Sequence, residues 1–137
     1  MTDLENCVLI VEDEFFIAES LRMHLEDMGV EVCGIAATAD DAVMLAQEHR
    51  PRLILMDMRL RGDGDGVDAA LAIHATVGSQ ILFVTGSQEP RTVQRIQLDH
   101  PIGVLFKPFS GWALRAAVQA ALADGGVGVM QTVRPDA

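Results

Sequence analysis

The feature that most constrains the fold is a run of four large apolar residues, Leu53–Met56, that ends at Asp57. A short continuous apolar run bounded by turn residues is typical of a strand buried on both faces of a sheet. The basic and glycine-rich stretch Arg59–Gly62 follows and predicts a loop. Asp57 would then lie at the carboxyl end of a central strand, where open α/β sheets bind ligands. Taken alone, the stretch favours the simpler interpretation that Asp57 only begins a turn.

Four similar apolar runs accompany this one. The runs at 7–11, 30–36, 81–84 and 102–106 predict strands, and most of the segments between them carry apolar residues at spacings of three and four. Strands that alternate with helices predict a parallel sheet covered by helices on both faces. Right-handed crossovers then favour a doubly wound α/β fold, a five-stranded parallel sheet of order 2-1-3-4-5 like that of flavodoxin.

The expected helices have identifiable ends and buried faces. Gly29 is placed to end the first helix in a left-handed cap, residues 38–41 resemble a capping box that opens a second helix reaching about His49, and Ser110 can cap the last helix. Pro51 separates the second helix from the strand that leads to Asp57. The expected buried positions are Ile17, Leu21, Leu25 and Met28 in the first helix, Val43, Leu45 and Ala46 in the second, Val67, Ala70 and Leu71 in a third over about 67–77, and Leu114, Ala117, Val118, Ala121 and Leu122 in the last. His74 shares the face of the third helix and is interpreted as a boundary residue that packs its ring.

The segment 89–99 differs from the other helical segments because it is polar. Only Val93, Ile96 and Leu98 offer apolar anchors there, so we expect a short, weakly held and mobile segment. Residues 124–137 are rich in glycine near their start and are expected to form a flexible tail after a single domain at 1–123.

Composition and charge exclude several classes of protein. The chain has 137 residues, 50% of them hydrophobic, and a net charge of -10, which argues against non-specific nucleic-acid binding. No apolar run is long enough to span a membrane and no signal peptide is recognisable, so we expect a cytoplasmic protein.

Cys7 and Cys33 are interpreted as small buried hydrophobic residues. The loop 62–66 alternates Gly and Asp but lacks the twelfth-position Glu of a calcium-binding loop.

The predicted topology brings five polar side chains to one edge of the sheet. Glu12 and Asp13 follow the first strand, Asp57 the third, Thr85 the fourth and Lys107 the fifth. Three carboxylates around one point repel one another unless a cation is bound, and their oxygen atoms favour Mg²⁺. Lys107 adds a positive charge and Thr85 a hydroxyl donor. The set predicts a site for a phosphoryl group on or near Asp57.

These residues, together with Pro108 and Phe109, resemble the receiver domain of two-component response regulators over residues 6–123. The resemblance implies that Asp57 accepts a phosphoryl group from a sensor histidine kinase or a histidine phosphotransfer protein, as in a phosphorelay. It implies that Glu12, Asp13, Asp57 and the backbone carbonyl of Arg59 hold Mg²⁺, and that Thr85 and Lys107 bind the phosphoryl oxygens. The Lys107–Pro108 peptide bond is typically cis in this family.

One position departs from the family pattern. Receivers usually carry Tyr or Phe three residues before the lysine, and this chain has Val104. Phe83–Gly86 is similar to the F-A-T-G motif of an atypical subgroup that also lacks the aromatic residue. Our hypothesis is that the segment 86–99 itself is the switch and becomes ordered when Thr85 contacts the phosphoryl group.

The resemblance implies a single-domain signalling protein that slowly hydrolyses its own aspartyl phosphate and turns over no external substrate. A phosphatase with an Asp nucleophile commonly needs a second Asp where Arg59 stands, and a flavodoxin-like cofactor site would need a glycine-rich loop where Glu12–Glu14 stands. A docking module that works without phosphorylation is the alternative. By resemblance, a downstream protein partner would bind the surface formed by 89–99, the fifth strand and the last helix.

Overall fold

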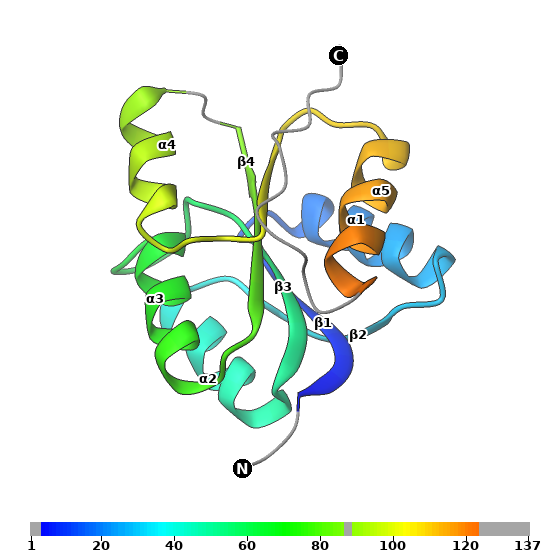
Figure 1. Ribbon diagram of the computed structural model, residues 1–137, viewed down its shortest axis with the longest axis horizontal. Coiled ribbons are helices and arrows are strands. Elements are labelled where there is room, and N and C mark those ends of the chain that lie inside the picture. The colour runs from blue at the N-terminus through cyan, green and yellow to red at the C-terminus, as the bar shows by residue number, and fades with distance from the viewer. Residues whose placement is uncertain (1–3, 87–88, 124–137) are drawn as a thin grey trace.

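The computed structural model describes residues 4–86 and 89–123, which form one parallel five-stranded sheet and five helices (Figure 1). The elements are β1 (Glu5–Val11), α1 (Phe15–Asp27), β2 (Glu31–Ala36), α2 (Ala39–His49), β3 (Pro51–Met56), α3 (Gly66–Thr76), β4 (Gln80–Thr85), α4 (Pro90–Gln97), β5 (Gly103–Phe106) and α5 (Gly111–Leu122). The strand order is β2-β1-β3-β4-β5, as the sequence predicted.

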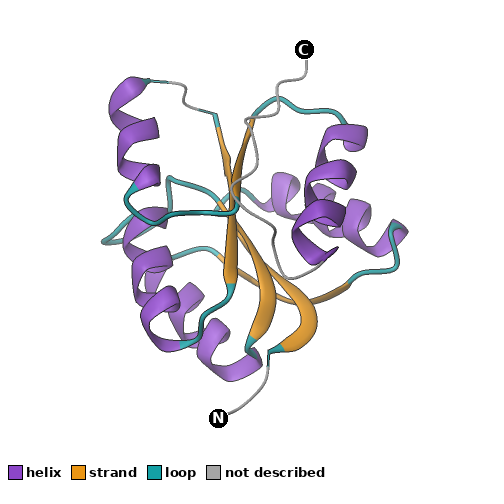
Figure 2. Cartoon of the chain, in the orientation of Figure 1, coloured by secondary structure: helices purple, strands orange, loops and turns teal. Residues whose placement is uncertain are grey.

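Helices cover both faces of the sheet, as Figure 2 shows. Helices α1 and α5 lie on one side, and α2, α3 and α4 lie on the other (Figure 1). Side chains of a strand alternate between the two faces, so Leu53 and Leu55 pack toward α1 and α5 while Ile54 and Met56 pack toward α2 and α3. Because helices cover both faces of the sheet, the sequences of the central strands are continuous apolar runs.

The structure has the three helix ends that the sequence predicted. Gly29 has a φ of 78°, the left-handed conformation expected after α1. Thr38 Oγ1 accepts a hydrogen bond from the Asp41 N–H at 3.0 Å, and Ser110 Oγ accepts one from Ala113 N–H at 3.0 Å. These contacts begin α2 and α5.

Parts of the expected buried faces were wrong. Leu71 is 42% exposed, because α3 is rotated so that Val67, Ala70 and Ile73 pack on the sheet. In α2 the fully buried positions include Ala42 rather than Val43 and Leu45, which are only partly buried. Small alanines allow α2 to approach the sheet closely, and the larger side chains then lie at the edge of the contact.

One boundary and one anchor also differ from the expectation. Pro51 is the first residue of β3 rather than a separator before it, a strand position that tolerates proline. Residues 90–97 form a short helix in which Ile96 is buried, whereas the expected anchor Leu98 is 60% exposed. Cys7 is buried, Cys33 is partly buried, and both are free thiols. The expected tail at 124–137 lies outside the described residues.

In the described part of the chain, no helix has the length and apolar character needed to cross a membrane.

Candidate functional site

The parallel strands deliver the predicted site residues to one edge of the sheet. Val11 pairs with Met56, so Asp57 begins at the level where β1 ends, and its amide donates to the Val11 carbonyl at 2.9 Å. Thr85 pairs with Phe106, and the Lys107 amide donates to the Thr85 carbonyl at 2.8 Å. The backbone hydrogen bonds between neighbouring strands therefore continue one residue past the ends of β3 and β5. These bonds fix the backbone positions of Asp57 and Lys107.

Three carboxylates meet at this edge, as the sequence predicted. Glu12, Asp13 and Asp57 each place a carboxylate oxygen within 4.8 Å of the other two. Glu12 and Asp57 are 3% and 8% exposed, so their charges are poorly screened by water. The Glu14 N–H donates to Glu12 Oε2 at 3.1 Å and helps to orient this carboxylate.

Lys107 supplies the positive charge that the carboxylates face. Its Nζ lies 2.8 Å from Glu12 Oε1 and 3.2 Å from Asp57 Oδ2. The Lys107–Pro108 peptide bond is cis, in agreement with the family resemblance. One ammonium group thus bridges the ends of β1 and β3 from the end of β5.

The pKa values reflect this crowded arrangement. Burial raises the pKa of Glu12 to about 7, and the charge of Asp57 adds to the increase although the hydrogen bond from Lys107 opposes it. Burial alone would lower the pKa of Lys107, but the hydrogen bond to Glu12 and the charge of Asp57 outweigh it and raise that pKa. The carboxylates carry more negative charge than one lysine neutralises, and a hard divalent cation bound by oxygen atoms fits this set.

A cavity of about 460 Å³ opens above Asp57. Thr85 is 2% exposed and lines the cavity, and Arg59 lines it too, with its amide 3.4 Å from Asp57 Oδ1. All the predicted site residues except Glu12 line this cavity. Glu12 accepts a hydrogen bond from Lys107, which is one of the lining residues. The expectation that the Arg59 carbonyl holds Mg²⁺ stays a prediction. The lining residues are Asp13, Glu14, Asp57, Met58, Arg59, Thr85, Gly86, Glu89, Thr92 and Lys107.

Sequence reasoning missed three residues at the site. Glu89 and Thr92, at the beginning of α4, form part of the cavity wall. Pro90 was a usable signal, because proline at the first position of a helix would have placed Glu89 at its cap. Gly66 lies so close to Asp57 that a Cβ there would collide with the Asp57 carbonyl oxygen.

Comparison with known proteins agrees with the fold. Residues 8–119 match the pattern of a family described as response regulator receiver domain. The chain is 35% identical over 115 residues to the transcriptional regulatory protein PdtaR of Mycobacterium tuberculosis, covering 84% of this chain and 56% of that protein. It is 33% identical over 121 residues to the phyllosphere-induced regulator PhyR of Methylorubrum extorquens, covering 88% and 45%. The chain therefore spans about half the length of these curated relatives.

A solved structure has the same fold. The signal receiver domain of a modulated diguanylate cyclase from Desulfovibrio desulfuricans G20 superposes with a TM-score of 0.80 at 38% identity, over 88% of this chain and 94% of that one. A CheY-like receiver domain protein from Methanospirillum hungatei JF-1 gives a TM-score of 0.78 at 26% identity, over 88% and 94%.

Proposed function

The chain belongs to the response regulator receiver family, and from this premise we propose that it accepts a phosphoryl group on Asp57 in a Mg²⁺-dependent reaction. The observation that carries the proposal is the position of the Asp57 carboxylate, nearly buried between the Lys107 ammonium and two further carboxylates at the floor of an open cavity. A nucleophile, a countercharge and a group of oxygen ligands are the components that phosphoryl transfer requires.

In the proposed reaction an Asp57 carboxylate oxygen attacks the phosphorus atom of a phosphohistidine. An oxygen–phosphorus bond forms while the nitrogen–phosphorus bond breaks, and the imidazole that leaves takes up a proton from water. Lys107 and the Thr85 hydroxyl donate hydrogen bonds to the phosphoryl oxygens. Mg²⁺ held by Glu12, Asp13, Asp57 and the carbonyl of Arg59 would neutralise charge on the transferred group.

We expect no turnover of an external substrate. Water that attacks the phosphorus of the aspartyl phosphate would slowly regenerate the carboxylate and release inorganic phosphate. Turnover of an external phosphoester would need a general acid to protonate its leaving oxygen, and the position two residues after Asp57, where phosphatases with an Asp nucleophile commonly carry a second Asp, holds Arg59.

The donor is proposed to be a sensor histidine kinase or a histidine phosphotransfer protein in the cytoplasm. An apolar groove of about 560 Å³ adjoins the site and shares Lys107 with it, so a protein bound there would bring its histidine close to Asp57. The groove is lined by Phe16, Ile17, Ser20, Leu21, His24, Lys107, Pro108 and Phe109. The signal would pass to a protein partner at the surface of α4, β5 and α5.

Intact mass spectrometry tests the proposal. Wild type and Asp57→Asn are each incubated with a small acyl phosphate, with and without Mg²⁺. We expect a labile gain of one phosphoryl group in wild type only, and only with Mg²⁺. A gain in both proteins would show that Asp57 is not the acceptor. No gain in either, with Mg²⁺ binding confirmed by titration, would favour a docking module that works without phosphorylation.

A further inference from the structure

Helix α4 forms one wall of the Asp57 cavity but is held by few apolar contacts. Ile96 is the buried residue of this helix and Val93 packs partly against the core. Thr92 and the cap residue Glu89 face the cavity. Apolar contacts hold this helix at only these two described positions, so polar contacts can help to fix where the wall lies.

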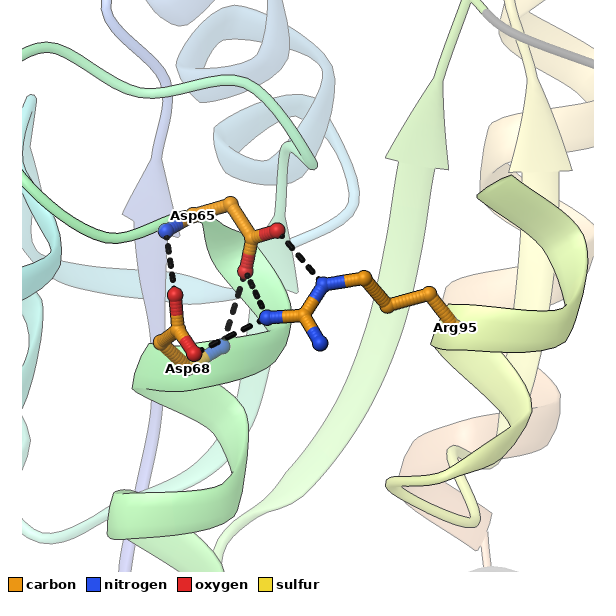
Figure 3. Close-up of polar contacts among 3 residues, drawn as sticks. All are labelled: Asp65, Asp68 and Arg95. Atoms are coloured by element: carbon orange, nitrogen blue, oxygen red, sulfur yellow. Dashed lines mark hydrogen bonds and ion pairs between the residues drawn. The ribbon is translucent and has the colours of Figure 1, made fainter. Parts of the chain in front are cut away.

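A cluster of charged side chains provides such a contact (Figure 3). Arg95 of α4 extends to the beginning of α3, where its Nε lies 2.8 Å from Asp65 Oδ2 and its Nη2 lies 3.1 Å from Asp65 Oδ1. The same Nη2 lies 2.9 Å from Asp68 Oδ1. One guanidinium thus binds one carboxylate with two hydrogen bonds and shares a third with a neighbouring carboxylate, a geometry that lysine cannot reproduce.

Both carboxylates also cap the beginning of α3, Asp65 as the N-cap residue and Asp68 from the first turn. Asp65 Oδ1 accepts from the Asp68 N–H at 3.0 Å, and Asp68 Oδ2 accepts from the Asp65 N–H at 2.8 Å, which forms a capping box. Partial burial would raise the pKa of Asp65, but the hydrogen bonds from Arg95 and from the Asp68 amide outweigh it and lower that pKa. Asp65 therefore stays ionised, fixed at once by its own helix and by α4.

The first turn of α3 contacts the phosphoacceptor directly. The Gly66 amide donates to the Met58 carbonyl at 2.8 Å, and the Gly66 Cα leaves no room for a Cβ beside the Asp57 carbonyl. On α4, Arg95 follows Thr92 by three residues, so the two side chains lie on the same face of the helix. The chain of contacts runs from Asp57 through Gly66 and Asp65 to Arg95, and from there to the cavity wall.

We propose that Arg95 is a positioning residue that couples the Asp57 loop to the α4 wall of the cavity through Asp65 and Asp68. This inference rests on the proposed phosphoacceptor function and adds the route by which a group bound at Asp57 fixes α4. The three side chains are partly exposed, and exposed ion pairs contribute little to global stability. The cluster therefore determines where α4 lies more than whether the chain folds.

Amide hydrogen exchange in wild type and Arg95→Gln, with and without Mg²⁺ and beryllium fluoride as the phosphoryl mimic, tests the coupling. In wild type we expect the mimic to slow exchange in both 57–66 and α4. In Arg95→Gln we expect the mimic to slow exchange in 57–66 but not in α4. Arg95→Lys keeps the charge without the paired hydrogen bonds and should show a partial response. Asp68→Asn should weaken the coupling from the other helix while it keeps an oxygen for the Asp65 amide.

Arg91→Gln is the matched control, since it removes the same charge from an exposed position of the same helix and should respond like wild type. Equal slowing of α4 in wild type and Arg95→Gln would overturn the coupling. A response confined to 57–66 in wild type would overturn it too, while the phosphoacceptor function stands. No response anywhere in wild type would contradict the phosphoacceptor function and this inference together.

Discussion

Gly66 shows at the scale of one residue how tightly the site is built. Its backbone lies against Asp57, and an added methyl group would meet a carbonyl oxygen and the Met56 side chain rather than a flexible chain end. Neither backbone can move without shifting the beginning of α3 or the end of β3. Glycine is thus required here by a close approach between backbones.

Replacement of Gly66 by Ala should destabilise the fold by about 1–3 kcal/mol, the usual cost of forcing extra volume into a packed site. The phosphoryl yield in the mass assay should also fall, because Asp57 must shift. Urea unfolding measures the first effect. Gly34→Ala is the control, since a Cβ there would make only ordinary contacts at 3.6 Å or more. Equal unfolding midpoints for Gly66→Ala and wild type would contradict the assigned packing.

His74 is a second residue whose surroundings determine a measurable property. Its Nδ1 lies 2.7 Å from Oδ1 of Asp99, a carboxylate with no exposed surface. The hydrogen bond to Asp99 raises the pKa of His74 above its ordinary value of 6.5, although burial acts in the opposite direction. Sequence reasoning treated His74 as a boundary residue that packs its ring and did not identify this partner.

The contribution of His74 to stability should therefore fall as pH rises. A raised pKa in the folded state means that the ion pair contributes fully below about pH 6.5 and that this contribution is lost as pH rises through the folded pKa. Urea unfolding of wild type and His74→Gln at about pH 6 and about pH 9 should show a larger difference between the proteins at the lower pH. A difference that does not change with pH would mean that the pKa of His74 is the same in the folded and unfolded states, which would contradict the assigned hydrogen bond to Asp99.

At the scale of elements, α4 is the helix that sequence reasoning described least well. Its apolar residues are few, so the position of its buried face could not be settled from spacing alone. The structure buries Ile96 completely and exposes Leu98, which follows the last helical residue. Whether the segment is mobile stays a prediction.

Ile96→Ala should remove about 2–4 kcal/mol from the free energy of unfolding, as is typical when a buried Ile is truncated. Leu98→Ala is the control and should change it by less than about 0.5 kcal/mol, since the side chain is mostly exposed. Urea unfolding of both variants gives the comparison. Similar losses in the two would indicate that both side chains anchor α4, as the sequence alone suggested.

The strands and the site were predictable for a local reason. Each central strand is buried on both faces and therefore reads as an unbroken apolar run, and Asp57, Thr85 and Lys107 each follow such a run directly. Parallel pairing then brings their side chains to one edge without further information. The positions of helix faces were less certain, because Leu71 fits an apolar stripe that the actual rotation of α3 leaves exposed.

Contacts between distant side chains were not predictable from the sequence. Arg95 and Asp65 are thirty positions apart, and Asp68 looks like an ordinary first-turn acid until α4 is placed beside it. Sequence reasoning did not identify the capping box of α3 either, although a local signal for it exists, because Asp65 and Asp68 are three residues apart at the beginning of an apolar helix. Local sequence patterns can identify a helix cap, whereas a hydrogen-bond partner on another helix can be identified only from the folded structure.

At the scale of the whole molecule, the Asp57 cavity and the apolar groove lie next to each other. Lys107 lines both, and the groove continues along α1, where Phe16 is 84% exposed. Large apolar side chains exposed beside a reactive site are typical of a surface that another protein covers. In the proposed function, a small phosphoryl donor reaches Asp57 through the cavity alone, whereas a protein donor also contacts the groove.

This difference predicts a selective defect in Phe16→Ala. Transfer from a cognate phosphohistidine protein should slow at least tenfold, because loss of a central aromatic contact commonly costs more than about 1.4 kcal/mol of binding. Phosphorylation by a small acyl phosphate should stay at the wild-type rate, as the cavity is untouched. Met44→Ala, which removes an exposed apolar side chain from α2 on the opposite face, should affect neither rate. Equal slowing with both donors would mean that Phe16 supports the Asp57 site itself. Unchanged transfer from the protein donor would mean that this donor binds elsewhere on the surface.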